Sequence, residues 1–271
     1  MHTKYRHDID GLRAIAVLSV VGFHAFPGWV PGGFIGVDVF FVISGFLISG
    51  IILSSLNNKE FSFRDFCVRR IRRIFPSLVI VMLACLGFGW LCLFTDEYKQ
   101  LGKHAAGGAT FLSNFLLWQE SGYFDNASEI KPLLHLWSLA IEEQFYILWP
   151  LLLWITWKLR WNYFLVMLTI AIVSFWLNLV SVRQNPIATF YAPWTRFWEL
   201  SCGGLLAWIQ HLQKQSANRS EPRIEKADKV GMLHAFSLSN ISSFTGLTLL
   251  GIGFARSEEH TSELQSQFRI S

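Results

Sequence analysis

The sequence has 271 residues, of which 52% are hydrophobic and only 15% are charged. Soluble domains carry nearer a quarter charged residues, so this composition excludes an ordinary soluble domain. Several apolar runs approach the roughly 20 residues that cross a bilayer, and the basic residues cluster between those runs, so the net charge of +4 does not indicate nucleic-acid binding. We therefore predict an all-α, polytopic transmembrane helical bundle with about seven spans.

The first apolar run, Leu12–Phe26, contains two ionisable residues, Arg13 and His24. A helix brings positions eleven residues apart to within about 20° of the same face and about 16 Å along its axis. Ionisable groups at membrane depth are costly and usually mark a functional path, so this stripe is a candidate site. The alternative is structural: the arginine snorkels at a helix end and the histidine bonds a nearby carbonyl.

Basic residues set the expected orientation of the following segments. The short basic N-terminus is predicted to be cytoplasmic. The second span, Phe34–Ser54, carries Asp38 near its outer end and leads to an arginine-rich cytoplasmic loop. The third span is expected from about Ile74 to Phe94, with Pro76 in its first turn, where the missing N–H is harmless.

Leu101–Trp118 is apolar but interrupted by several polar residues and glycines. Basic residues follow the next span, Leu136–Trp157, and they also precede the third span, so both places are expected to be cytoplasmic. An even number of crossings must therefore separate these two places, and the third span and Leu136–Trp157 already supply two. We predict that Leu101–Trp118 is re-entrant or interfacial on the outer side.

Three further spans are expected near the C-terminal half, with polar loops between them: Trp161–Val180, Arg196–Ile209 and Phe236–Ala255. From Arg256 the sequence turns abruptly polar and resembles a translated sequencing adapter. The predicted organisation is therefore a partial membrane domain over residues 1–255 and a foreign tail over residues 256–271. The four cysteines have no metal-ligand spacing and are expected to be buried thiols, and no metal site is predicted.

A second chemical stripe begins the Leu136–Trp157 span. On a helix, His135, Ser138, Glu142 and Tyr146 share one face, with Glu143 beside it. Two adjacent carboxylates near a membrane repel each other, so one is expected to have a cationic partner or a raised pKa. A carboxylate beside an imidazole suits base catalysis, whereas acids at a helix start can be purely structural.

The arginine-rich segment contains Arg69, Arg70, Arg72 and Arg73, which converge on helical spacing and could bind a polyphosphate. The alternative is that they set topology and contact anionic lipid. Arg196 and Glu199 are one turn apart and are expected to form an ion pair.

Five segments resemble the acyltransferase family 3 proteins, which are bacterial inner-membrane O-acyltransferases. The matching segments are Asp10–Arg13 with His24, Gly33–Ile48, Arg69–Pro76, Glu142–Tyr146 and Thr195–Leu200. The resemblance implies transfer of an acyl group, usually acetyl from cytoplasmic acetyl-CoA, to a hydroxyl of a cell-envelope glycan such as lipopolysaccharide O-antigen. It also implies several further spans and an extracytoplasmic hydrolase-like domain beyond the present sequence.

These two lines together predict a membrane O-acyltransferase with acetyl-CoA as donor substrate and no permanent cofactor. The arginines hold the donor phosphates, Arg13 guides its pantetheine arm, and His24 acts as general base or acyl relay with support from Glu142 or Glu143. A transporter is the chief rival, but it predicts inverted repeats, and no repeat is visible in the sequence. A lipid-binding scaffold without chemistry is the third hypothesis.

Overall fold

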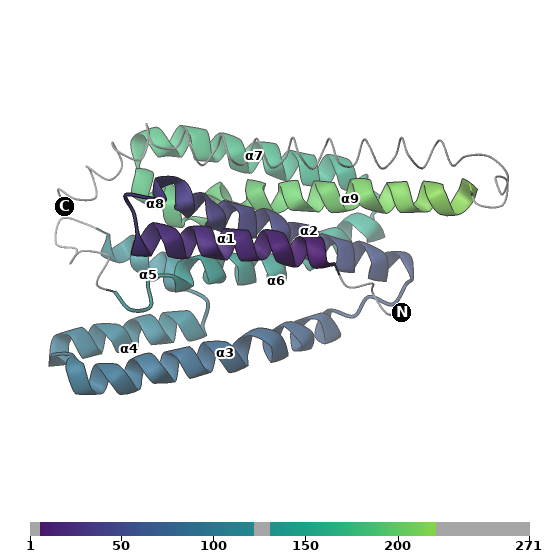
Figure 1. The fold of residues 1–271 in the computed structure, drawn as a ribbon. Helices are drawn as coiled ribbons and strands as arrows, with labels where there is room; N and C mark the ends of the chain where they lie inside the picture. Colours follow the sequence, from purple (N-terminus) through teal and green to yellow (C-terminus); the bar gives the residue numbers. More distant parts are fainter. Residues whose placement is uncertain (1–5, 122–130, 221–271) are drawn as a thin grey trace. The chain divides into compact units, whose positions relative to one another are not determined.

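The computed structural model describes residues 6–121 and 131–220, and within them every regular element is helical, as predicted. The elements are, in order, α1 His7–Ala25, η1 Pro31–Phe34, α2 Ile35–Asn57, α3 Phe63–Cys92, α4 Thr95–Ala109, α5 Ser113–Glu120, α6 Leu136–Lys158, α7 Tyr163–Gln184, α8 Pro186–Tyr191, η3 Pro193–Thr195 and α9 Phe197–Ser220 (Figure 1).

Among the described residues, three helical segments are long and apolar enough to cross a membrane: Pro31–Asn57, Phe63–Cys92 and Tyr163–Gln184. Large apolar side chains make up most of the exposed surface of Tyr163–Gln184 and of the part of Phe63–Cys92 that follows Ile74, as lipid contact requires. The chain is thus a helical membrane protein. The expected total of about seven spans stays a prediction, and the expected Phe236–Ala255 span and the polar tail lie outside the described residues.

The described residues fall into two compact units, one of residues 6–43 with 209–220 and the other within Ser44–Trp208. In the first unit, Gly36 at the start of α2 meets the α1 backbone so closely that an added Cβ would overlap the carbonyl oxygen of Ala16. In the second, Gly45 meets the start of α9 in the same way, at Leu200. Small residues in α2 therefore permit close helix packing, as expected for membrane helices.

The prediction of an arginine-rich loop before the third span is wrong, because the arginines from Arg64 to Arg73 are part of a helix. α3 begins at Phe63, where the Ser62 side chain accepts a hydrogen bond from the Asp65 backbone N–H at 3.3 Å. This N-cap starts the helix about three turns before the apolar run. Pro76 consequently lies inside α3 rather than in its first turn.

The polar-interrupted Leu101–Trp118 segment forms two short helices, α4 and α5, separated by a break at Phe111, whose φ is 55°. α4 folds back along α3 (Figure 1). Its 15 residues measure about 22 Å, which is less than the roughly 30 Å of a bilayer core. Neither helix crosses a membrane alone, which is compatible with the predicted re-entrant or interfacial placement, although that placement stays a prediction.

The four cysteines carry free thiols, but none is fully buried as expected: Cys67, Cys85 and Cys202 are half-buried, and Cys92 is exposed at the end of α3. The outer loop expected after α7 contains two short helices instead. Asn185 caps the first of them, α8, by accepting from the Ala188 N–H at 3.0 Å. Pro186 then occupies its first turn, where proline is tolerated.

Candidate functional site

His24 lies in the last turn of α1, and its Nδ1 is 2.8 Å from the carbonyl oxygen of Val20. A carbonyl oxygen only accepts hydrogen bonds, so the neutral ring carries its proton on Nδ1 and its basic lone pair on Nε2. The ring is exposed and meets Phe23 edge to face, with 5.3 Å between ring centroids. The carbonyl bond named as the structural alternative is therefore present, and it sets the tautomer that a general base needs.

Arg13 lies on α1 eleven residues before His24, and because α1 is helical throughout, the two share a face. Its Nη1 is 3.9 Å from Asp10 Oδ1, with both side chains more than one-third exposed. Such an exposed pair contributes at most about 1 kcal/mol, so the guanidinium can exchange this partner for a ligand. Asp38 is half-buried on α2 in the same unit.

Glu142 accepts two side-chain hydrogen bonds in the second unit. Ser44 Oγ donates to its Oε1 at 3.0 Å and Tyr146 OH to its Oε2 at 3.1 Å. Glu143, one residue further on, is buried with 8% of its surface exposed, and its Oε1 accepts no hydrogen bond from the described residues. The two adjacent carboxylates thus have different surroundings, one solvated by hydroxyls and the other desolvated.

Arg70 is the arginine that turns toward these acids. Its guanidinium carbon lies 4.8 Å from the centroid of the Tyr146 ring and 5.9 Å from that of Phe66, and the group attracts both Glu142 and Glu143 electrostatically. Tyr146 is near the middle of α6, so Arg70 is level with the centre of that helix. A cation at this level does more than set topology.

The other three arginines do not join this cluster. Arg69, Arg72 and Arg73 are exposed on the remaining faces of α3. The predicted convergence of four guanidinium groups therefore separates into one half-buried group facing the acids of α6 and three groups on the surface. His135, the first residue of the predicted α6 stripe, is exposed at the N-cap position, so the inward part of the stripe is Glu142 and Tyr146.

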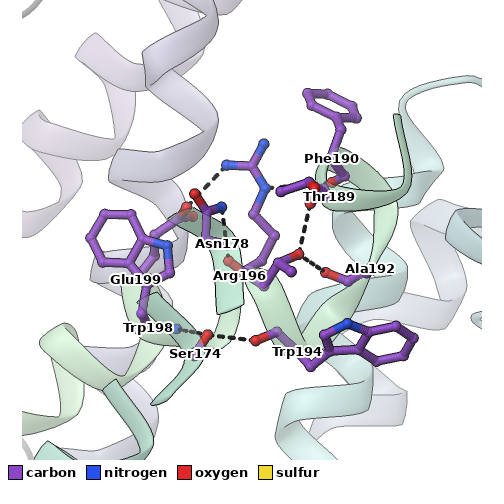
Figure 2. Close-up of polar contacts among 10 residues, drawn as sticks. Ser174, Asn178, Thr189, Phe190, Ala192, Trp194, Arg196, Trp198 and Glu199 are labelled. Carbon is purple, nitrogen blue, oxygen red and sulfur yellow. Dashed lines mark hydrogen bonds and ion pairs between the residues drawn. The ribbon is translucent and has the colours of Figure 1, made fainter. Parts of the chain in front are cut away.

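The predicted Arg196–Glu199 ion pair is present, with Nη1 and Oε1 3.0 Å apart, and it belongs to a larger network between α7 and α9 (Figure 2). Arg196 Nε also donates to the Phe190 carbonyl at 3.4 Å, and its guanidinium lies 5.1 Å from that ring. Ser174 on α7 donates to the Trp194 carbonyl at 2.7 Å and accepts from the Trp198 N–H at 2.9 Å. Glu199 is 1% exposed, so this network fixes the corner through α8 and η3.

Sequence reasoning missed a charged cluster around Glu120 at the end of α5. Lys103 Nζ lies 2.9 Å and Lys131 Nζ 3.3 Å from its carboxylate, and His104 Nε2 lies 2.9 Å away without the alignment of a hydrogen bond. Burial alone would raise the pKa of Glu120, but these cations outweigh it and leave the pKa below its usual value. Burial lowers the pKa of His104, against the opposing effect of Glu120. Lys103 and His104 were visible in the sequence as interruptions of an apolar segment, but nothing there indicated their common partner.

Residues 6–266 match the family model described as "Acyltransferase domain". The chain is 37% identical over 232 residues to YrhL of Bacillus subtilis (strain 168), named as a candidate peptidoglycan O-acetyltransferase, covering 83% of this chain and 36% of that protein. It is 33% identical over 243 residues to the peptidoglycan O-acetyltransferase OatA of Listeria monocytogenes, covering 87% and 38%. A candidate O-acetyltransferase of Staphylococcus aureus (strain MSSA476) is 35% identical, covering 76% and 35%.

The chain therefore spans a little over one-third of the length of these relatives. No solved structure matches it.

Proposed function

The chain belongs to the acyltransferase family whose model its residues 6–266 match, and from that premise we propose that it transfers an acetyl group to a hydroxyl of a cell-envelope glycan within a bacterial cell membrane. Peptidoglycan is the proposed acceptor because two of the relatives are named for it. The lipopolysaccharide O-antigen suggested by the sequence is the alternative acceptor. The proposed donor is acetyl-CoA, used as a substrate.

The observation that carries this proposal is the His24 tautomer. Nδ1–H bonded to the Val20 carbonyl leaves Nε2 as the base, on an exposed ring in the last turn of α1. In the proposed reaction, Nε2 takes the proton of the acceptor hydroxyl while the oxygen attacks the thioester carbonyl carbon. The carbon–sulfur bond then breaks, and the imidazolium returns its proton to the departing thiolate, so atoms and charge balance.

Arg13 is about 16 Å from His24 along α1, so the two cannot hold the same reacting atom. For Arg13 we keep the predicted role in guiding the donor, away from its reacting end, and for the exposed Arg69, Arg72 and Arg73 the predicted role in binding phosphate; the first residue lies in the first unit and the other three lie in the second. Exposed guanidinium groups suit this role because they form bidentate bonds with phosphate without breaking internal ion pairs. Within the second unit, Arg70 attracts Glu142 and Glu143 electrostatically, and the support of His24 by either acid stays a prediction.

The proposed orientation places the N-terminus and the start of α3 in the cytoplasm, with about seven spans in the complete bundle. The positive-inside rule supports it, because arginines flank the start of α3 and Lys158 and Arg160 follow α6. Cysteine labelling from either side of the membrane at Arg69, Asp125 and Lys158 tests this arrangement. Cytoplasmic labelling at Asp125 would show that α4 and α5 together complete a crossing.

The activity is tested with membranes that contain the chain, labelled acetyl-CoA and either peptidoglycan fragments or O-antigen polysaccharide. His24→Ala should reduce transfer by about 10²–10⁴-fold, the usual contribution of a general base, while the protein still inserts. His7→Ala removes a histidine from the opposite end of α1 and serves as the matched control. Transfer at the unsubstituted rate by an inserted His24→Ala protein would refute the role of His24, and absence of transfer to either glycan would refute the proposed function.

A further inference from the structure

Two aromatic side chains directly follow His24 and are largely uncovered. Phe26 is 62% exposed and Trp29 is 88% exposed, the highest value among the exposed large apolar side chains of the described residues. Their ring centroids are 6.1 Å apart with an interplanar angle of 33°. Both belong to the unit that contains α1, so their relation to His24 is fixed by the local chain.

Hydrogen bonds hold the turn that presents these rings. The backbone N–H groups of Trp29 and Val30 both donate to the Phe26 carbonyl, at 2.9 and 3.1 Å, and the Phe26 N–H donates to Gly22 at 2.8 Å. The Val30 side chain packs against α1 at Gly22, where an added Cβ would lie 3.3 Å from Val30 Cγ2. The backbone that carries both rings is therefore held in one conformation, so a ligand that stacks on them costs the protein little backbone entropy.

The proposed function, on which this inference rests, requires a sugar hydroxyl within hydrogen-bond reach of His24 Nε2. The rest of that sugar must then lie beside the end of α1, where Phe26 and Trp29 follow His24 by two and five residues. The C–H face of a sugar ring is apolar and weakly electropositive, and it matches the electron-rich face of an aromatic ring. We infer that Phe26 and Trp29 form the acceptor subsite, in which a hexose ring of the glycan stacks beside His24.

The rival occupant of this surface is lipid, because tryptophan is common at membrane interfaces. Leucine and phenylalanine both contact lipid well, but only phenylalanine stacks on a sugar. Comparing Trp29→Leu with Trp29→Phe therefore separates the two occupants. Trp90→Leu is the matched control, since Trp90 is 74% exposed on α3 and is remote in sequence from the turn.

The experiment measures equilibrium binding of a labelled N-acetylglucosaminyl-N-acetylmuramyl disaccharide to the chain in lipid nanodiscs. Trp29→Leu should weaken binding about tenfold, the loss expected for one stacking contact with its buried area, and Trp29→Phe about twofold. Trp90→Leu should bind as the unsubstituted chain does. Equal affinity of the Leu and Phe variants, or absence of disaccharide binding by the unsubstituted chain, would overturn the inference.

Acetyl transfer is measured in parallel to separate this inference from the proposed function. Disaccharide binding that depends on an aromatic residue at position 29, without any transfer, would support the subsite and refute the acetyltransferase activity. Transfer that proceeds with the same KM for the disaccharide in Trp29→Leu would support the activity and refute the subsite. Loss of membrane insertion in Trp29→Leu with unchanged disaccharide affinity of the inserted fraction would assign the rings to lipid.

Discussion

Tyr146→Phe removes one hydroxyl from the interior of α6 and should lower the free energy of unfolding by about 1.5–3 kcal/mol, the range for hydrogen bonds to charged groups. Tyr146 is only 5% exposed, and its hydroxyl donates to Glu142 Oε2 at 3.1 Å. The substitution keeps the ring and its packing, so it adds no appreciable cavity cost. The expected loss therefore comes from one fewer donor to a half-buried carboxylate.

The measurement is chemical unfolding of both proteins in one detergent, with Tyr98→Phe as the matched control. The Tyr98 ring packs against Trp90 with 5.5 Å between centroids, and within the described residues its hydroxyl makes no hydrogen bond. Ser44→Ala should resemble Tyr146→Phe because Ser44 donates to the other oxygen of the same carboxylate at 3.0 Å. The two changes share a partner, so their combined effect should differ from the sum.

Unfolding of Tyr146→Phe at the same denaturant concentration as Tyr98→Phe would refute this reasoning. It would mean that the hydroxyl bonds do not stabilise the carboxylate in the folded chain. Glu142 would then be available for chemistry rather than for holding α2 against α6.

Three further predictions use other parts of the structure. Gly45→Ala places a methyl group on the α9 backbone and should destabilise the fold by about 1–3 kcal/mol or more in the same unfolding assay, whereas Gly87→Ala meets nothing within 4 Å and should be neutral. The cations around Glu120 lower its pKa in the folded protein, so its contribution to stability is present above its usual pKa of 4.5 and is lost as the pH falls through the lower folded pKa. Hydrogen exchange of α4 and α5 should therefore accelerate at that low pH, and Glu120→Gln should remove this pH dependence. Arg70→Gln removes the half-buried cation that attracts Glu142 and the buried Glu143 and should cost about 1–3 kcal/mol, against less than about 0.5 kcal/mol for the exposed Arg69→Gln, as read from thermal unfolding.

Helix identity was largely predictable because apolar runs of this length have few alternatives in a membrane. The start of α3 was placed too late because dense positive charge was interpreted as a loop. The sequence contained the correcting signal: Ser62 is followed three residues later by an acid, Asp65, which is an N-terminal capping pattern. Charge density and helix formation are independent, so a cap should have outweighed the charge.

The direction in which α3 faces could not be predicted. Helical spacing places Arg70 beside Arg73, and Arg69 beside both Arg72 and Arg73. It does not say which of these two neighbouring faces of α3 meets α6. That choice follows from packing between distant segments, as in the contact of Arg70 with Tyr146. The same limit applies to Ser44, because spacing along α2 does not show that its hydroxyl donates to Glu142.

The polar residues of α5 show where sequence reasoning was nearly sufficient. Asn114 is one of the polar residues that interrupt the apolar segment Leu101–Trp118, and in the structure it is buried in protein. Its Nδ2 donates to the Tyr191 carbonyl at 3.1 Å, and its Oδ1 accepts from Gln144 at 3.0 Å. The amide side chain argues against a lipid-facing position, but the hydrogen-bond partners that hold it inside the protein are 77 and 30 residues away in the sequence.

Ionisable groups in this chain divide into two kinds that should respond differently to substitution. The side chains of Glu199 and Glu120 are only 1% and 12% exposed, and each is paired with cations of its own unit. Without these pairs, charged groups would be desolvated without a counter-charge. His24 and Arg69 are exposed, and their charge costs the fold little. Neutralising the first kind should lower stability before it changes chemistry, because a buried partner is left without its counter-charge. Neutralising the second should lower acetyl transfer in a protein of unchanged stability, because water can replace the lost contacts but cannot replace a base or a phosphate-binding group.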